Sequence, residues 1–341
     1  MTITLTEEDI KRDKHFLDKV LKMARSPGDR IVLSPGLVTY TRGSWAFPEF
    51  GWIGLANGVS LTTADPESGD RGVVVLSEEA VKETTGKTRV SRDINILWAG
   101  AGTFISRIDF DCNGNNHPGW NCGGLRFHGQ FAVTDCNITG LSGTLGQQEV
   151  FAISAQGETG RSKVAGVRVY DCLVDRPASY VSGIYLGASE PGAESWVSDC
   201  DVDLGVNGWF AYSSTNQTLF LRCKGRAQRW WHTDTENGVA RIQECSGESS
   251  YAVISSVCAG GNPERRIYVL DSKFEGGEGR FVEWWDKAGS QTGFVLFRDC
   301  SLSAKYDVAS DAKRGSLVFT GCKSDYRQSH WTSGSPQPIH V

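Results

Sequence analysis

One pattern of apolar and polar positions recurs along most of the chain. A short stretch of alternating apolar and polar residues ends in Asp-Cys or a close variant, and a glycine or small residue then leads into a second apolar stretch. Alternation with a period of two is typical of β-strands that bury one face. The pattern predicts short strands joined by turns, without helices between them. The nine stretches end at Cys112, Cys136, Cys172, Cys200, Cys223, Cys245, Ser272, Cys300 and Cys322.

The intervals between these positions are 22 to 36 residues, a spacing typical of solenoid proteins. Leucine is not dominant and no helical half-repeat follows the strand, which argues against leucine-rich repeats. We therefore predict an all-β fold, a right-handed parallel β-helix in which each coil forms hydrogen bonds with the next. Cysteines stacked in register would lie about 4.8 Å apart, farther than the Cβ atoms of a disulfide, so we expect free thiols.

The first residues follow a helical pattern instead. Thr6 and the acidic residues after it predict a helix start, and the apolar residues from Phe16 to Ala24 keep helical spacing until Pro27-Gly28. A helix can cover the apolar side chains that the open end of a β-helix would expose. We predict an N-terminal capping α-helix over residues 1–28, a single β-helix domain over 29–328 and a C-terminal tail over 329–341.

The segment from Phe16 to Gly36, with its Pro-Gly-Asp-Arg-Ile-Val-Leu-Ser-Pro-Gly core, resembles the opening of pectin-lyase-like right-handed parallel β-helix proteins. The later units, in which a strand ends in Asp-Cys and a Gly-Ile-Tyr-Leu segment follows, resemble the coils of that superfamily. The resemblance implies the fold for roughly residues 10 to 325. The superfamily holds polysaccharide lyases, glycoside hydrolases, uronate epimerases, isomerases and phage tailspikes. The paired aspartates of its polygalacturonases are absent, which argues against plain galacturonan hydrolysis.

The resemblance also implies a substrate groove along the strand that carries the Gly-Ile-Tyr-Leu segment. In the matching stretch from Trp230 to Glu236, alternation places a histidine and two carboxylates on one side of the strand, although a slip of one residue would exchange the faces. Carboxylates and an imidazole on one face can act as general acids and bases. A further carboxylate follows two coils later, about 10 Å along the axis. The candidate catalytic residues are His232, Asp234, Glu236 and Glu283.

Aromatic and basic side chains on the same strands are candidates for binding sugar rings, on which aromatic faces can stack. Two tryptophan pairs, Trp230-Trp231 and Trp284-Trp285, predict that at least one ring of each pair is exposed. The candidate substrate-binding residues are Tyr185, Tyr212, Arg229, Trp231, Trp285 and Lys287. The alternative is that the tryptophans are core residues and the charges are solvated strand ends.

The composition and charge of the chain argue against some classes of binding partner. The 341 residues carry 35 Lys and Arg against 40 Asp and Glu, and no basic stripe predicts nucleic-acid binding. No apolar run approaches the roughly 18 residues that a membrane span needs. The N-terminus lacks the pattern of a signal peptide, so we expect a cytoplasmic or virion-associated protein, or an extracellular one exported by another route. We expect a monomer or small oligomer.

No cofactor is firmly indicated. The segment from Asp109 to His117 is a candidate Ca²⁺ site, but its spacing favours a polar turn. We predict a carbohydrate-active enzyme that acts on a polysaccharide or oligosaccharide by lyase, hydrolase or epimerase-type chemistry. One alternative is a non-catalytic structural or glycan-binding β-helix, such as a phage particle component. The other is a small-molecule isomerase or cyclase on the same fold.

Overall fold

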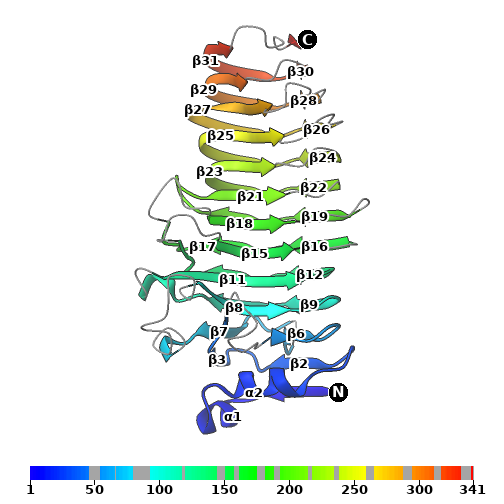
Figure 1. Ribbon diagram of the computed structural model, residues 1–341, viewed down its shortest axis with the longest axis vertical. Coiled ribbons are helices and arrows are strands. Elements are labelled where there is room, and N and C mark those ends of the chain that lie inside the picture. The colour runs from blue at the N-terminus through cyan, green and yellow to red at the C-terminus, as the bar shows by residue number, and fades with distance from the viewer. Residues whose placement is uncertain are drawn as a thin grey trace.

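The computed structural model describes residues 1–45, 54–65, 67–79, 93–116, 120–143, 150–156, 161–174, 181–187, 193–213, 217–233, 238–258, 265–286, 294–310, 316–331 and 339–340. In this part of the chain, short strands form coils that stack along one long axis, with the N-terminus at one end and the C-terminus at the other (Figure 1). The strands form two long sheets, one of 13 strands and one of 19. We name them sheet A and sheet B.

Sheet A receives one strand from each coil, and all of its neighbouring strands are parallel. Its strands are, in spatial order, β1 (Thr2–Leu5), β2 (Arg30–Leu33), β6 (Ser60–Thr63), β9 (Thr103–Ser106), β12 (Phe131–Thr134), β16 (Arg161–Ala165), β19 (Glu194–Ser198), β22 (Gln217–Leu221), β24 (Gly238–Gln243), β26 (Arg265–Leu270), β28 (Phe294–Arg298), β30 (Ser316–Thr320) and β32 (Ile339–His340).

Sheet B is built in two segments per coil. The first segment contains β3 (Val38–Thr41), β7 (Gly72–Leu76), β10 (Ile108–Asp111), β13 (Asn137–Thr139), β17 (Arg168–Tyr170) and β20 (Asp201–Asp203). The second contains β4 (Ser44–Trp45), β5 (Gly54–Leu55), β8 (Asp93–Ala99), β11 (Asn121–His128), β14 (Ser142–Gly143), β15 (Val150–Gln156), β18 (Val181–Leu186) and β21 (Trp209–Ser213). Towards the C-terminus both segments merge into the single strands β23 (Lys224–Thr233), β25 (Ser246–Cys258), β27 (Lys273–Asp286), β29 (Ser301–Ser310) and β31 (Lys323–Trp331).

The core consists of apolar side chains stacked in rows between the sheets. In sheet A, one inward position is apolar in every coil from β2 to β30, and all of its side chains are buried. Stacking buries both sides of each ring or methyl group, because the coil below and the coil above cover it. The row consists of Ile31, Leu61, Ile105, Val133, Val164, Val197, Phe220, Ile242, Val269, Phe297 and Phe319.

The recurring Asp-Cys pair marks the corner between sheet A and sheet B. The residue before the cysteine has a φ between +51° and +55° at Asp135, Asp199, Arg222, Glu244 and Asp299. Asp and Asn tolerate this left-handed conformation better than most side chains, and glycine adopts it without strain. Gly166 and Gly321 take the same place in two other coils. The sequence signature is therefore a local requirement of the corner.

The strand register corrects two members of the predicted cysteine series. Asn137 pairs with Asp109 and with Arg168, so the residues stacked on Cys136 are Ile108 and Val167. Cys112 and Cys172 lie later in their coils and do not belong to this column. The column consists of Ile108, Cys136, Val167, Cys200, Cys223, Cys245, Ser272, Cys300 and Cys322. The local motif recurs at Cys172, after Asp171 at φ +52°, so pattern matching alone cannot distinguish the two corners.

Within this column, thiols and hydroxyls contact the next coil directly. The backbone N–H of Cys223 donates to Sγ of Cys245 at 3.4 Å, and that of Cys245 donates to Oγ of Ser272 at 3.1 Å. Ser272 thus makes the contact that a cysteine makes one coil earlier. The nine cysteines whose side chains the structure describes are free thiols.

The N-terminal segment differs from a single predicted helix. It contains the strand β1 and two short helices, α1 (Glu7–Arg12) and α2 (Phe16–Met23), at the N-terminal end of the stack (Figure 1). The chain leaves helical geometry at Asp13, whose φ is −152°. Helix α2 buries Leu17, Val20 and Leu21. At the other end, β32 lies inside the predicted tail and pairs with β30. None of the described helices is long and apolar enough to cross a membrane.

Candidate functional site

One row of side chains on the outer face of sheet B combines rings, a hydroxyl and a carboxylate. Strand pairing places Tyr185, Tyr212, His232, Ser255 and Glu283 side by side on β18, β21, β23, β25 and β27. We call these five residues the site row. Its neighbours in the strand, such as Ile184, Trp231 and Ile254, form the adjacent inward row and are buried. The alternation of the strand therefore separates the site row from the core.

The aromatic half of the site row is a continuous stack. The rings of Tyr185 and Tyr212 are parallel within 4° at 4.8 Å, and the imidazole of His232 follows at 5.3 Å. Trp209, three residues before Tyr212, contacts the same imidazole at 4.7 Å. In-register parallel strands bring equivalent side chains to about 4.8 Å, which is a stacking distance for rings. The stack holds the imidazole between two aromatic faces and the Ser255 hydroxyl.

The polar half of the site row centres on Glu283, whose side chain is 3% exposed. Its Oε2 accepts hydrogen bonds from Ser255 Oγ at 2.7 Å and from Arg229 Nε at 3.1 Å. Its Oε1 accepts a hydrogen bond from Tyr251 Oη at 2.7 Å. These three donors, one of them the cation Arg229, compensate the carboxylate for its loss of water. Burial and the bond to Glu283 raise the pKa of Tyr251, which keeps its hydroxyl protonated as a donor.

These contacts determine the tautomer of His232. Nδ1 of His232 lies 3.0 Å from Ser255 Oγ. The only proton of that hydroxyl goes to Glu283, because a carboxylate only accepts. Nδ1 must therefore carry a proton and donate it to Ser255. In the neutral imidazole, the lone pair that can take up a proton is then on Nε2.

Two guanidinium groups flank the site row around Tyr251. Arg229 lies 4.4 Å and Arg280 4.6 Å from the centre of the Tyr251 ring. Arg229 is paired with Glu283, and its guanidinium also donates to Gln228 at 3.2 Å. Arg280 has no carboxylate partner among the described residues, and its Nε is buried without a hydrogen bond. The cluster of Arg229, Arg280 and Glu283 therefore carries one uncompensated positive charge.

The structure brings half of the predicted site residues together. Tyr185, Tyr212, Arg229, His232 and Glu283 lie on adjacent strands, and Glu283 is two strands from His232, as the repeat predicts. Asp234, Glu236 and Lys287 lie outside the described residues, as does the side chain of Trp285.

The expectation that one of Trp230 and Trp231 is exposed is wrong. Their side chains are 0% and 2% exposed. The strand bends between the two segments of sheet B, with a register shift between Ala227 and Arg229, so two consecutive residues face the interior. Trp230 stacks on Phe210 at 4.3 Å and occupies the space that the missing side chain of Gly247 leaves. Trp231 is therefore a core residue and does not line the outer face.

Four further residues belong to the site although they were not among the candidates. They are Trp209, Tyr251, Ser255 and Arg280. Ser255 follows from the strand alignment that already contains His232 and Glu283. Tyr251 lies at a register irregularity of β25 between Glu248 and Ala252, so counting along the strand does not place it. Arg280 lies beyond the matching irregularity in β27.

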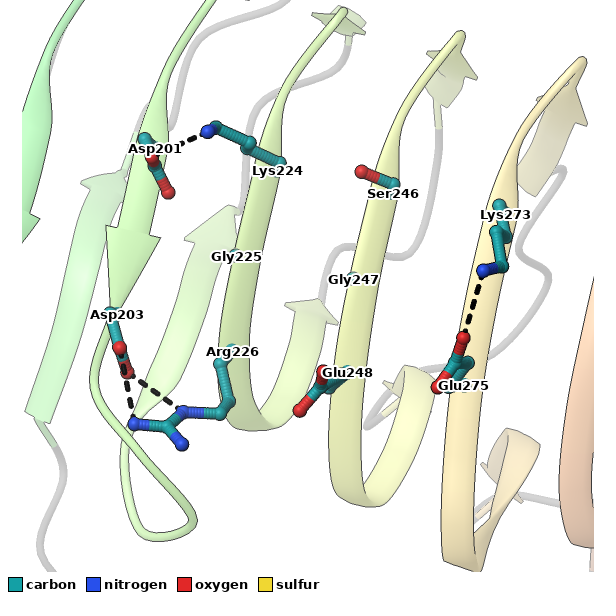
Figure 2. A pocket seen from close by; sticks show the side chains of 10 residues that line it. All are labelled: Asp201, Asp203, Lys224, Gly225, Arg226, Ser246, Gly247, Glu248, Lys273 and Glu275. Atoms are coloured by element: carbon teal, nitrogen blue, oxygen red, sulfur yellow. Dashed lines mark hydrogen bonds and ion pairs between the residues drawn. The ribbon is translucent and has the colours of Figure 1, made fainter.

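A concavity of about 520 Å³ lies apart from the site row, on the first segment of sheet B (Figure 2). Each of its three cations already has a carboxylate partner. Lys224 pairs with Asp201 at 2.9 Å, Arg226 with Asp203 at 3.1 Å, and Lys273 with Glu275 at 3.0 Å. The concavity therefore offers little charge to a ligand. Two of its ion pairs join the neighbouring strands β20 and β23, and the third lies within β27.

Among the described residues, no group of three or more His, Cys, Asp or Glu side chains is placed so that it could hold a metal ion. Asp109, in the candidate calcium segment, accepts hydrogen bonds from Asn137 at 2.8 Å and from Arg71 at 3.4 Å. His117 lies outside the described residues. The calcium site stays a prediction.

No model of a known protein family matches the sequence. No curated protein matches it either. Solved structures do match. The surface adhesin PfbA of Streptococcus pneumoniae aligns with a TM-score of 0.62 and 7% identity over 93% of this chain and 85% of its own. The catalytic domain of a GH87 alpha-1,3-glucanase, in complex with nigerose, aligns with a TM-score of 0.60 and 8% identity over 100% and 67%.

The tailspike protein of E. coli bacteriophage HK620, in complex with a pentasaccharide, aligns with a TM-score of 0.58 and 13% identity over 95% of this chain. The chain spans 60% of the tailspike chain. At these identities the similarity establishes the fold. The protein is a right-handed parallel β-helix, the fold of the pectin-lyase-like superfamily that the sequence resembles.

Proposed function

We propose that the protein is a carbohydrate-active enzyme that acts on an acidic polysaccharide lying along the site row. The observation that carries this proposal is the guanidinium of Arg280, which has no carboxylate partner among the described residues. It lies over the ring of Tyr251, the residue that donates a hydrogen bond to Glu283 at the end of the site row. Neighbouring rings cover the faces of the aromatic stack in the site row, so its ring edges and tyrosine hydroxyls are what it offers to a sugar. A guanidinium binds a carboxylate in two parallel hydrogen bonds. A tailspike and a glucanase with the same fold bind a pentasaccharide and nigerose.

For such a substrate we propose abstraction of the proton next to a uronate carboxylate. Nε2 of neutral His232 takes this proton, while Arg280 stabilises the negative charge that develops on the carboxylate. Elimination then forms a carbon–carbon double bond as the bond to the glycosidic oxygen breaks, and that oxygen takes up a proton. Return of the proton to the opposite face would instead give epimerisation. Glu283 and Ser255 do not touch the substrate in this scheme. They hold His232 in the required tautomer.

Glycoside hydrolysis is the second candidate reaction. It needs two carboxyl groups on either side of the scissile bond. Glu283 suits neither role well, because three donors occupy its two oxygens. Hydrolysis would therefore depend on Asp234 and Glu236.

Other roles remain as alternatives that the same experiment separates. A non-catalytic glycan-binding protein, as the adhesin and tailspike neighbours suggest, would bind the polymer without changing it. A small-molecule isomerase would convert a monomer and ignore polymers. Our proposals for cofactor, location and assembly follow the sequence. They are no firm cofactor, with Ca²⁺ at the segment from Asp109 as the candidate, and a monomer or small oligomer that is cytoplasmic, virion-associated, or extracellular by another export route. We also propose that α2 caps the N-terminal end of the stack, because its buried face includes Leu17 and Leu21.

The test is incubation with polygalacturonate, alginate and neutral dextran. Ultraviolet absorbance of unsaturated uronate indicates elimination, and new reducing ends without absorbance indicate hydrolysis. The variant His232→Gln should lose activity, whereas His128→Gln, which changes an exposed histidine on β11, should keep it. Arg280→Gln should raise KM for the acidic polymers. Binding without turnover would support the glycan-binding alternative. The proposal would be overturned if the protein neither bound nor converted any of these polymers.

A further inference from the structure

Sheet A carries an exposed apolar row on its outer face. The register places Lys163, Trp196, Leu219, Arg241 and Tyr268 side by side on five successive strands. Trp196 is 52% exposed, and Val239, in the flanking row, is 46% exposed. Outward positions of a solvated sheet are usually polar, and a contiguous apolar patch on a surface marks an interaction site.

The centre of this surface is a shallow hollow of about 240 Å³. Trp196, Leu219 and Val239 form its apolar floor, and Gln217 and Gln243 stand at its edges. Among the described residues, the indole of Trp196 has no aromatic neighbour and no hydrogen bond, so both its face and its N–H are open to a ligand. An apolar floor with amide and guanidinium groups around it matches a sugar ring, which has C–H faces and a rim of hydroxyls.

The charges around the hollow are predominantly positive. Lys163 and Arg241 stand at the two ends of the Trp196–Leu219 pair, three strand spacings or about 14 Å apart. Arg266 is exposed beside Val239 in the flanking row. None of these three cations has an ion pair in the part of the chain that the structure describes. One acid, Glu194, also lines the hollow, two residues before Trp196 on β19, and it is already paired with Arg161 at 2.8 Å.

The charge and the size of the surface together indicate which class of ligand binds there. A second copy of the chain packed face to face would oppose cation to cation, which is unfavourable. The hollow is lined by ten residues, fewer than the roughly 20–30 that each partner contributes to a stable protein interface. An acidic glycan satisfies both conditions, since its rings fit the floor and its carboxylates meet Lys163, Arg241 and Arg266.

We propose that Lys163, Trp196, Leu219, Val239, Arg241 and Arg266 form a second glycan-binding site, on sheet A, for an acidic polysaccharide. We name it the sheet A site. It holds the polymer without chemistry, because the acid–base groups of the site row belong to sheet B. The choice of a polysaccharide as ligand rests on the proposed function. The location and the preference for an anion rest on Trp196 and the unpaired cations.

The test is affinity electrophoresis and calorimetry with polygalacturonate, alginate and neutral dextran. The background is His232→Gln, which prevents turnover, and Arg280→Gln is added to weaken binding at the site row. Trp196→Ala should raise the Kd of the remaining binding about tenfold, as expected for one aromatic contact. Arg241→Ala should raise it similarly and reduce its dependence on salt. Tyr170→Ala, which removes a 39% exposed ring on β17 of sheet B, is the matched control and should change nothing.

Each outcome decides the proposal. Residual binding of acidic polymers that Trp196→Ala and Arg241→Ala both weaken supports the sheet A site, even when the wild-type protein shows no turnover. Binding that depends on Arg280 alone overturns the sheet A site and leaves the proposed function intact. If the protein binds none of the acidic polymers, both the sheet A site and the proposed function are overturned. A concentration-dependent dimer in analytical ultracentrifugation that Trp196→Ala abolishes also overturns the proposal, because the occupant would then be a second copy.

Discussion

The tautomer of His232 is the most direct test of the site geometry. Ser255 Oγ lies 2.7 Å from Glu283 Oε2 and 3.0 Å from His232 Nδ1. Reversing the hydroxyl towards Nδ1 would give up a hydrogen bond to a charged group, worth about 1.5–3 kcal/mol. Since 1.36 kcal/mol is a factor of ten, the Nδ1–H tautomer should exceed the other by roughly ten- to a hundredfold. The variant Glu283→Gln removes the negative charge and should release this preference.

The measurement is ¹⁵N NMR of protein labelled at histidine, at about pH 8, above the ordinary pKa of histidine. The sequence has 6 histidines, and the signal lost in His232→Gln assigns the right one. In the wild type, Nδ1 should be protonated. In Glu283→Gln, the populations should become comparable, and any turnover should fall about 10²- to 10⁴-fold, the contribution of a general base.

Tyr251→Phe is the matched control for this variant. It removes the hydrogen bond to Oε1 of Glu283 and leaves the one between Ser255 and Oε2 intact. The tautomer of His232 should then stay as in the wild type. A wild-type signal from the Nε2–H tautomer, or an unchanged tautomer in Glu283→Gln, would refute the reasoning that connects Glu283 to His232 through Ser255.

Three further predictions concern the fold. Gly247→Ala should lower the free energy of unfolding by about 1–3 kcal/mol, because the added Cβ would collide with the indole of Trp230. The measurement is the melting temperature, which should fall. Gly69→Ala is the control and should be neutral, because the added Cβ meets open space. Burial raises the pKa of Asp18, so its protonated form stabilises the fold at acidic pH, and this contribution is lost as pH rises through the raised pKa. The melting temperature of the wild type minus that of Asp18→Asn should therefore fall as pH rises above about 4, the ordinary pKa of an aspartate. Burial raises the pKa of Cys136 and Cys300 to about 12, so both should resist alkylation near pH 8 in the native protein, while the unfolded, unreduced chain should titrate as 10 free thiols. A difference in melting temperature that does not change with pH would contradict the prediction for Asp18. Fewer than 10 free thiols in the unfolded chain would contradict the prediction for the cysteines.

Part of the candidate site was predictable because a β-helix repeats its geometry. Tyr185, Tyr212, His232 and Glu283 each lie in the second apolar stretch of their coil, so aligning these stretches aligns the strands. Tyr251 and Arg280 were not predictable in the same way. Irregularities in β25 and β27 change the number of residues between corner and site, and the alignment of the sequence cannot show how the register recovers.

The sequence by itself determined the class of fold, because its signals are local. Alternation specifies strands, and the acid before the cysteine specifies a corner with positive φ. Only the tertiary structure decided which residues stack. It placed Ile108 and Val167, instead of Cys112 and Cys172, in the cysteine column, and it turned both Trp230 and Trp231 inward. Register and strand bending depend on the packing of neighbouring coils, and a slip of one residue exchanges the two faces of a strand.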